Sequence, residues 1–337
     1  MGAPGKGIAF VGNILVDIVK NIDHYPEIGT LVNIHSSSMA VGGSVPNTAM
    51  DLATIDPAVP ICAAGMVGKD DYGSFVLSQM KAKGIDVSRV VKSEATPTSF
   101  TDVMNIPSGE RTFFHMRGAN AEFSPEMVDL DGLDCDILHA GYILLLDKFD
   151  GKDAEYGTAM ARFLHDAQEK GIKTSVDAVS DSSADYAAMM LPALKYCDYA
   201  IMNEIEACAI WGLEPYAAGC IQPEIIRTAM VKMAEAGVRE KVIIHSKGMG
   251  FCLDARTGNF TAVPSLRIPA EEIKGSVGAG DAFCAGSLYG IYTGMQDKEI
   301  LEFASAAAAC NLFCENSVDG MRNREEVYKV MEQYPRQ

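Results

Sequence analysis

Hydrophobic residues along this chain fall into short continuous runs, separated by stretches with helical periodicity. Such runs are typical of strands covered on both faces, as in a parallel sheet, and they span residues 7–19, 59–68, 137–142, 174–177, 199–203 and 242–246. Helices are predicted between them, including residues 155–170, 185–195, 204–212 and 222–236. This alternation predicts one α/β domain over residues 1–337, with a doubly wound, mostly parallel sheet flanked by helices.

Two stretches interrupt the alternation with extended rather than helical patterns, at residues 18–40 and 96–117. Pro26, Gly29 and a run of serines break the first stretch into short pieces. The second stretch has two strand-like runs on either side of a turn at residues 107–110, which is a hairpin pattern. Together they predict a small β lid over one end of the main domain, suited to exclude water from a reaction there.

The composition narrows the classes of function and of compartment. The 337 residues are 48% hydrophobic and carry a formal net charge of −17, which argues against binding to nucleic acid or to an anionic membrane. No apolar run reaches the ~18–20 residues of a membrane span, and the first residues lack a signal-peptide profile. Nine scattered cysteines form no CxxC pair, which is typical of a reducing compartment. We therefore expect a cytoplasmic protein.

Residues 275–283 combine a glycine-rich loop, an acidic residue and the start of an apolar helix. Gly278 and Gly280 flank an alanine, so the backbone can approach a ligand closely. Free N–H groups and the positive end of the helix dipole would then form an anion-binding site. Asp281 is suited to take a proton from a nucleophile that attacks a bound phosphoryl group. The alternative is a glycine turn in which Asp281 is an ordinary helix N-cap.

Two common nucleotide-binding motifs are absent from the sequence. No Gly-x-x-x-x-Gly-Lys-Ser/Thr string occurs, and the first strand is followed by Gly12-Asn13-Ile14-Leu15 rather than by a GxGxxG turn. These absences argue against a Walker-type phosphate loop and against a dinucleotide-dependent dehydrogenase.

Polar residues are predicted at the carboxyl ends of several strands, where ligands bind in open α/β sheets. They are Asp17, Gly42-Gly43, Asp177, Asn203 and the turn at residues 247–250. Asp17 is interpreted either as a turn cap or as an acid that binds hydroxyl groups. Asn47, in the first turn of the helix after Gly43, either has a structural role or faces a ligand. The convergence favours a ligand site at one edge of the sheet.

Four motifs resemble those of the ribokinase-like, or PfkB, family of carbohydrate kinases. Residues 278–286 resemble the family's second signature, and Gly42-Gly43 with Asn47 and Ala49 resembles the first. Residues 65–73 are similar to Gly-x-x-Gly-x-Asp-x-x-Gly, and residues 203–206 are similar to Asn-x-x-Glu. The resemblance runs in order from about residue 7 to residue 330. It implies a ribokinase-like fold and an ATP-dependent sugar kinase.

The resemblance also implies a role for each matching position. Asp281 would be the general base that deprotonates a sugar hydroxyl, beside an anion hole formed by the backbone of Gly278, Ala279 and Gly280. Sugar hydroxyls would be held by Asp17, Gly42, Gly43 and Asn47. The nucleotide phosphates would lie along Ser246, Lys247, Gly248 and Gly250, with the adenine and ribose near Asn311. The Mg²⁺ of Mg-ATP would be held through water by Asn203 and Glu206.

One departure from the family pattern concerns a monovalent cation. Residues 275–277 are Gly-Ser-Val, where the family usually has Asp-Thr-Thr. That Asp helps to bind an activating monovalent cation in many members, so Gly275 predicts that activation by potassium is weak or absent. Because Gly278 and Asp281 are retained, catalysis is still expected.

The predictions of the substrate and of the oligomeric state both depend on residues of the lid. Residues 110–120 resemble a segment that fructokinase-like and ketodeoxygluconate kinase-like members use near the sugar. There Arg117 would bind a carboxylate or a phosphate; alternatively it pairs with a lid acid. A small sugar or sugar acid is therefore favoured. The alternatives are a nucleoside kinase, because Phe113 and Phe114 suit stacking on a base, and a non-catalytic sugar- or nucleotide-binding protein. The extended lid edges predict a homodimer formed through the lid.

Overall fold

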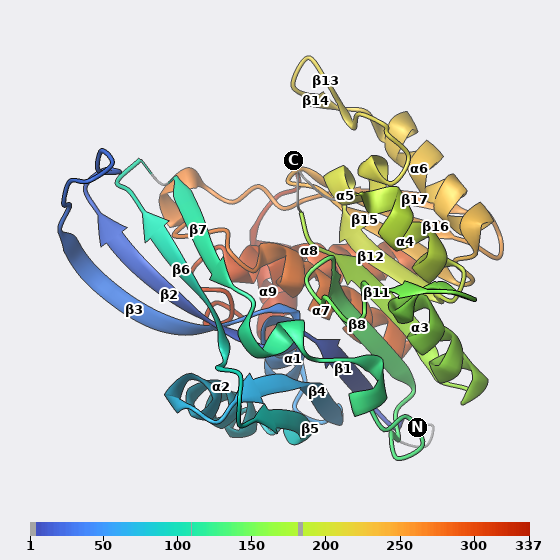
Figure 1. Cartoon of the computed structure of the whole chain (residues 1–337). Helices are drawn as coiled ribbons and strands as arrows, with labels where there is room; N and C mark the ends of the chain where they lie inside the picture. The colour runs from blue at the N-terminus through green and yellow to red at the C-terminus, as the bar shows by residue number, and fades with distance from the viewer. Residues whose placement is uncertain (1–4, 109, 181–184) are drawn as a thin grey trace.

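A nine-stranded sheet forms the centre of the computed structural model, which describes residues 5–108, 110–180 and 185–337 (Figure 1). The strand order is β17-β16-β15-β12-β11-β8-β1-β4-β5. Strands from β15 to β5 pair in parallel, and β16 and β17 extend the sheet as antiparallel strands. Their bounds are β1 Ile8–Gly12, β4 Ile61–Gly68, β5 Asp86–Ser93, β8 Ile137–Ile143, β11 Lys173–Ala178, β12 Tyr199–Asn203, β15 Lys241–His245, β16 Met249–Asp254 and β17 Phe260–Pro264. The predicted mostly parallel α/β sheet is confirmed.

Helices cover both faces of this sheet, and each face has its own hydrophobic core. Side chains alternate along the strands, so Ile8 and Phe10 of β1 enter one core while Ala9 and Val11 enter the other. The first core is closed by α1 (Ser44–Ile55), α2 (Asp71–Ala82), α7 (Ala279–Thr293), α8 (Asp297–Asn311) and α9 (Arg324–Gln333). The second is closed by α3 (Ala159–Glu169), α4 (Tyr186–Leu194), α5 (Glu204–Ala209) and α6 (Pro223–Ala236). The molecule thus has the three-layer arrangement of a doubly wound fold.

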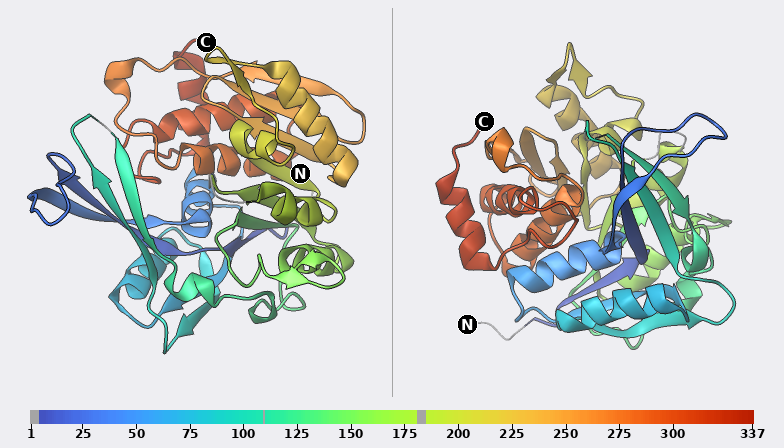
Figure 2. Two further views of the ribbon diagram at one scale, coloured as in Figure 1. Left: turned by 45° about the horizontal axis from the view of Figure 1, so that its top comes forward. Right: turned by 90° about the vertical axis from the view of Figure 1, so that its left-hand side faces the viewer.

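A second, four-stranded sheet projects from one side of the main body, as Figures 1 and 2 show. Its order is β3-β2-β6-β7, with β2 Leu15–Ile22, β3 Ile34–Gly42, β6 Ser99–Asn105 and β7 Arg111–Met116. β2 pairs antiparallel with β3 and parallel with β6, and β6 pairs antiparallel with β7. The two interrupting stretches therefore meet in one sheet, called the small sheet below. Gly109, in the expected turn between β6 and β7, lies outside the described residues.

The apolar run of residues 7–19, expected to form one strand of the parallel sheet, is divided between the two sheets. β1 ends at Gly12 and β2 begins at Leu15. Between them, the side chain of Asn120 accepts a hydrogen bond from the Ile14 N–H (3.1 Å) and donates one to the Ile14 carbonyl (3.1 Å). A side chain thus satisfies the backbone groups of Ile14 that a strand neighbour would otherwise pair. The expectation of one continuous strand is wrong.

This division moves two predicted site residues. Asp17 lies on β2 of the small sheet and Gly42 ends β3 of the small sheet, so neither follows a strand of the main sheet as expected. Gly43 comes next, with a φ of 92°, and α1 starts at Ser44. Asp17 and the start of α1 are therefore contributed by the joint between the two sheets.

The remaining elements are short. The hairpins are β9 (Lys152–Asp153) with β10 (Gly157–Thr158), and β13 (Tyr216–Ala217) with β14 (Cys220–Ile221). The 3₁₀ turns are η1 (Gly118–Ala121), η2 (Pro125–Met127) and η3 (Ala270–Glu272). Within the described ranges, no helix is both long enough and apolar enough to cross a membrane.

Candidate active site

A pocket of about 240 Å³ opens at the carboxyl ends of β8, β11, β12 and β15, beside the first turn of α7. Its walls include Tyr142, Asp177, Asn203, His245 and Asp281. Each of the four strands contributes a residue at or near its carboxyl end, which is where open α/β sheets place their ligands. The structure thus brings Asp177 and Asn203, which were expected at strand ends, together with Asp281 of the glycine-rich loop.

The N-terminus of α7 presents unpaired backbone donors to this pocket. Gly278 has a φ of 79°, a conformation that glycine adopts without penalty. Among the described residues, the N–H groups of Gly278, Gly280 and Asp281 have no hydrogen-bond acceptor, whereas that of Ala279 reaches the Ser276 carbonyl at 3.3 Å. Together with the helix dipole, these donors make a site of positive potential. The loop is suited to hold a phosphate or a developing negative charge.

Asp281 is buried beside these donors and is held by two partners. The Asn47 amide donates to its Oδ2 at 2.9 Å, and the Tyr142 hydroxyl lies 2.9 Å from both of its carboxylate oxygens. Burial, followed by repulsion from Asp177, raises the pKa of Asp281 to about 7. A carboxyl group with that pKa is half ionised at neutral pH, which suits it to accept a proton from a hydroxyl group. Asn47, expected to face a ligand or to be structural, orients this carboxylate.

Tyr142, at the end of the strand expected over residues 137–142, was not predicted to have a function. Its φ of 59° is unusual for a residue other than glycine, and its N–H donates to Asp177. This turn in the backbone directs the hydroxyl group at Asp281. The only signal in the sequence was a tyrosine directly after a glycine at the end of a buried strand.

Asn311, expected near the adenine and ribose, lies in the core and does not line the pocket. It is fully buried in α8, and its amide donates to the Ser317 carbonyl at 2.6 Å. The Ser317 hydroxyl in turn donates to Asn47 at 2.9 Å. Ser317 also packs against Gly278, where an added Cβ would come within 2.5 Å of the Ser317 carbonyl oxygen. Asn311 therefore supports the loop behind the anion site.

Asn203 and Glu206 form a capping box at the start of α5, and both line the pocket. Glu206 accepts hydrogen bonds from the Asn203 amide (2.7 Å) and from the Ser180 hydroxyl (2.8 Å). Burial raises the pKa of Glu206 to about 8. In the part of the chain that the structure describes, no lysine or arginine pairs with Glu206, and the oxygen atoms of Glu206 and Asn203 are of the type that Mg²⁺ prefers. The residues present thus fit a magnesium site that includes bound water.

Asp17 stands on the small-sheet side of Asp281. Burial raises the pKa of Asp17 to about 7, and the negative charge of Asp17 contributes to the raised pKa of Asp281. A Cβ on Gly42 would lie 2.5 Å from Asp17 Oδ2, so the glycine makes room for the carboxyl group. The two acids therefore lie in one neighbourhood, and among the described residues neither forms an ion pair with a lysine or an arginine.

Arg117, directly after β7, pairs with Asp147 in the loop after β8. The Nη1–Oδ1 distance is 2.6 Å, and both side chains are partly exposed. The pairing corresponds to the alternative in which Arg117 meets an acid, although Asp147 belongs to the main domain and not to the small sheet. The guanidinium keeps further donors that are not used by Asp147.

The predicted phosphate-side residues lie in the turn after β15. Ser246 closes this turn by hydrogen bonds with the Met249 backbone at 3.0 Å, and Lys247 is exposed. Gly248 lies within the turn, and Gly250 is the second residue of the return strand β16, where it packs against Phe283. His245, which sequence analysis did not single out, lines the pocket just before them. Burial lowers the pKa of His245 to about 4, so it is neutral and packs on Phe283 at a ring distance of 4.9 Å.

Comparison with protein families gives a match over most of the chain. A family model described as "pfkB family carbohydrate kinase" matches residues 6–324. Among curated proteins, the ribokinase of Arabidopsis thaliana is 24% identical over 330 residues, covering 96% of this chain and 80% of that protein. The 2-dehydro-3-deoxygluconokinase of Bacillus subtilis is 24% identical over 311 residues, covering 89% of each.

Comparison with solved structures supports the same fold. Ribokinase from Thermotoga maritima superposes with a TM-score of 0.78 at 21% identity, covering 97% of this chain and 99% of that one. Arabidopsis thaliana ribokinase, solved with ribose and ATP, gives a TM-score of 0.79 at 22% identity, covering 97% and 98%. At these identities the likeness demonstrates a shared fold.

Proposed function

The chain belongs to the pfkB family of carbohydrate kinases, and from this premise we propose that it transfers the γ-phosphoryl group of Mg-ATP to a hydroxyl group of a small sugar or sugar acid. One observation carries the proposal: a buried carboxyl group with a pKa of about 7 stands beside unpaired backbone donors at the start of α7. The names of the relatives, ribokinase and 2-dehydro-3-deoxygluconokinase, support this substrate class.

In the proposed reaction Asp281 accepts the proton of the attacking sugar hydroxyl. Asn47 and Tyr142 hold its carboxylate in place through hydrogen bonds of 2.9 Å. The N–H groups of Gly278, Gly280 and Asp281 face the negative charge that develops on the transferred phosphoryl group. Most of the acceleration in such reactions comes from positioning and electrostatic stabilisation. These residues supply both.

The two substrates are proposed to enter from opposite sides of Asp281. Asp17, Gly42, Gly43 and Asn47 would hold sugar hydroxyls at the joint with the small sheet. Ser246, Lys247, Gly248 and Gly250 would line the phosphates of ATP, and Asn311 would act by supporting the loop under Gly278. Magnesium, when bound with ATP, neutralises phosphate charge, and Asn203 and Glu206 would hold it through water.

Arg117 is the proposed contact for a substrate that carries a negative charge. Its ion pair with Asp147 is partly exposed, so the pair is weak and an anionic group can compete for the guanidinium. A carboxylate or phosphate accepts two parallel hydrogen bonds from Arg, which a neutral sugar does not. This residue therefore favours a sugar acid or a sugar phosphate over a simple sugar.

The test is coupled release of ADP from Mg-ATP against ribose, fructose, other hexoses, sugar acids, fructose 1-phosphate and nucleosides. The proposal is supported if one sugar or sugar acid is phosphorylated much faster than the others. ADP release with nucleosides alone would replace the proposal with a nucleoside kinase.

The rates with this panel are also measured in potassium and in sodium buffers. We expect equal rates, because a Cβ at Gly275 would lie 2.7 Å from the Cys314 carbonyl oxygen and leaves no room for the Asp that binds a cation in relatives.

Tyr142→Phe is expected to shift the pH dependence of kcat/KM upwards by about one pH unit. Asp281 is active as a base when ionised, so the rate should fall as the pH drops through about 7. The Tyr142 hydroxyl donates to the ionised carboxylate and thereby lowers its pKa, so its removal raises the pKa. The measurement is a pH–rate profile. Tyr216→Phe, which removes a hydroxyl group bound to Glu204 outside the pocket, is the control; identical profiles for both variants and the parent would contradict the role.

We infer a homodimer that forms through the small sheet. Six large apolar side chains are exposed on its strands and tip: Ile28, Leu31, Ile34, Met39, Phe113 and Phe114. Such a concentration is typical of an interaction surface. Sedimentation velocity should give twice the mass of one chain, and Ile34→Glu should give a monomer. Val231→Glu on α6, which adds the same charge at an exposed apolar position elsewhere, should stay dimeric; a monomeric parent protein would refute the inference.

A further inference from the structure

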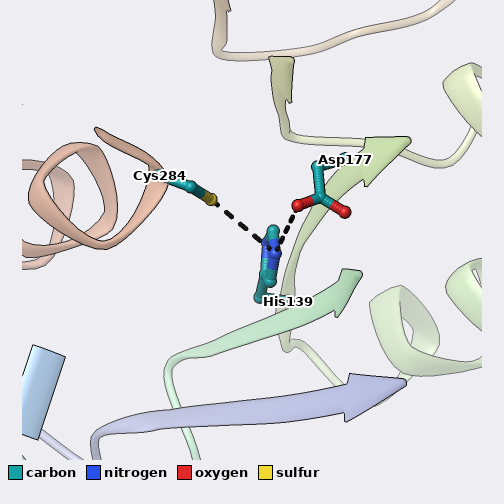
Figure 3. Close-up of side chains that lie close together, drawn as sticks. All are labelled: His139, Asp177 and Cys284. Carbon is teal, nitrogen blue, oxygen red and sulfur yellow. Dashed lines mark hydrogen bonds and ion pairs between the residues drawn. The ribbon is translucent and has the colours of Figure 1, made fainter. Parts of the chain in front are cut away.

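A histidine, an aspartate and a cysteine lie close together at the wall of the pocket. His139 comes from β8, Asp177 from β11 and Cys284 from α7. One possible ligand atom of each lies within 4.8 Å of the others, and all three residues are buried. Figure 3 shows the Cys284 sulfur and the Asp177 carboxylate approaching the same His139 ring from two sides. Asp177 and Cys284 also line the pocket, which provides a path from solvent.

The spacing of these atoms matches a metal coordination shell, and only the sulfur–nitrogen contact is also within the range of a weak hydrogen bond. Cys284 Sγ lies 3.7 Å, and Asp177 Oδ2 3.6 Å, from His139 Nε2. A nitrogen and an oxygen at 3.6 Å are too far apart for a hydrogen bond. Ligands bound to Zn²⁺ at about 2.0–2.3 Å in tetrahedral geometry are about 3.3–3.8 Å from one another. The two distances to His139 are therefore those of a metal site, and the third pair of ligand atoms lies within 4.8 Å.

The orientation of the histidine ring also distinguishes a ligand from a catalytic base. In a nucleophile–His–acid triad, the nucleophile and the acid contact different ring nitrogens. Here Cys284 and Asp177 both face Nε2, and Nδ1 lies 3.0 Å from the Ser175 hydroxyl. A hydrogen bond like the one between Nδ1 and Ser175 orients a metal-binding histidine and leaves Nε2 free to bind the ion.

The negative groups around the cluster would favour binding of a cation. Asp177 is bound by the Tyr142 N–H, and Asp281 by Asn47 and Tyr142; among the described residues, neither acid is paired with a lysine or an arginine. Asp177 uses Oδ1 for the Tyr142 N–H, so Oδ2 is available toward His139. Two buried carboxyl groups and a thiol thus lie together, and within the described ranges the only group paired with any of them that can carry a positive charge is His139 itself.

We propose that His139 Nε2, Asp177 Oδ2 and Cys284 Sγ form a binding site for a transition-metal cation of the zinc type, with a fourth position open to the pocket. Imidazole and thiolate ligands suit such ions, whereas Mg²⁺ binds oxygen ligands. The thiol proton is released to solvent when the ion binds, because the thiolate is the ligand. The site is therefore distinct from the oxygen donors of Asn203 and Glu206.

The bound ion inhibits the proposed phosphoryl transfer; this consequence rests on the proposed function. Cys284 follows Asp281 by one helical turn, and Asp177 holds the backbone of Tyr142, whose hydroxyl group positions Asp281. A divalent charge at this place stabilises the Asp281 carboxylate and weakens it as a base. Micromolar zinc would then lower the rate without competing with the sugar.

The binding test uses cobalt(II) as a coloured substitute for zinc, added to the full chain without ATP or magnesium. We expect one equivalent to bind, with the near-ultraviolet charge-transfer band of a thiolate ligand, and zinc to displace it. Cys284→Ala should lose the band and bind zinc at least about tenfold more weakly. Cys310→Ala, which also removes a buried thiol from a helix, is the matched control and should keep both. A parent protein without the band, or a band that persists in Cys284→Ala, would refute the site.

Two further measurements separate the site from its consequence. Thermal unfolding of Cys284→Ala without metal shows whether that variant is folded, and Asp177→Asn supplies a second variant that keeps the acceptor for Tyr142. Zinc inhibition is compared as the ratio of rates with and without zinc for each variant. A cobalt band in a protein that phosphorylates no substrate would leave the metal site standing and remove the proposed function. Equal inhibition of the parent and Cys284→Ala would overturn the inhibitory role.

Discussion

Asp281→Asn is expected to lower kcat by about 10²–10⁴-fold, the range attributed to a general base. The amide keeps the shape of the carboxyl group and an oxygen that accepts from Tyr142 and Asn47, but it does not accept a proton from the sugar. Binding of ATP should be nearly unchanged, because the backbone donors of the α7 N-terminus are intact. Coupled ADP release gives kcat, and calorimetric titration gives the affinity for ATP.

Asp17→Asn is the matched control, because it makes the same chemical change in the same neighbourhood. Asp17 is proposed to bind sugar hydroxyls, so this variant should mainly raise the KM for the sugar and affect kcat less. If Asp281→Asn kept more than about a tenth of the parent kcat, Asp281 would not be the base. If both variants lost kcat equally, the separate roles would be wrong.

Gly278→Ala is expected to lower kcat by about 10²–10³-fold, as loss of an oxyanion-hole donor does. Gly278 has a φ of 79°, and an added Cβ would lie 2.5 Å from the Ser317 carbonyl oxygen. Because Ser317 is held by Asn47 and Asn311, the loop at 278 has to move instead. Its N–H group would then no longer face the phosphoryl group. Steady-state kinetics measures the loss.

The control for this variant is Gly294→Ala, at the other end of α7. Gly294 has a φ of 76°, and a Cβ there meets no atom within 4 Å. Both substitutions carry the same backbone penalty of about 1–2 kcal/mol, which chemical denaturation should detect in each. Only Gly278→Ala should lose kcat. Equal kinetic losses would mean that the effect comes from destabilisation of the helix and not from the anion site.

The fold was predictable wherever a segment behaves in the same way in isolation and in the sheet. The apolar runs that became β8, β11, β12 and β15 are continuous because both of their faces are covered. The edge strand β5 has a mixed pattern of buried and exposed residues, and it was not recognised. The break between β1 and β2 was hidden because Ile14 is as apolar and buried as its neighbours. What ends the strand is Asn120, 106 residues away.

The site was predictable in the same local sense. The glycine loop with Asp281 forms within one segment, and so does the capping box of Asn203 and Glu206. The contacts that set the chemistry do not: Asp281 meets Asn47 across 234 residues and Tyr142 across 139 residues. The same holds for the meeting of His139 and Cys284, which are 145 residues apart. Such neighbours depend on the strand order, and one sequence does not contain that order.

The clamp of Asn120 on Ile14 has a mechanical consequence. These hydrogen bonds join the segment before β2 to the segment after β7. Two of the connections between the small sheet and the main domain are therefore held together at one point. A rotation of the small sheet must pivot there or break both hydrogen bonds. Asp17 lies three residues from this hinge, whereas Ile28 lies beyond the far end of β2. A closing motion would therefore move the tip through a wide arc, while Asp17, the acid proposed to bind the sugar, stays almost still.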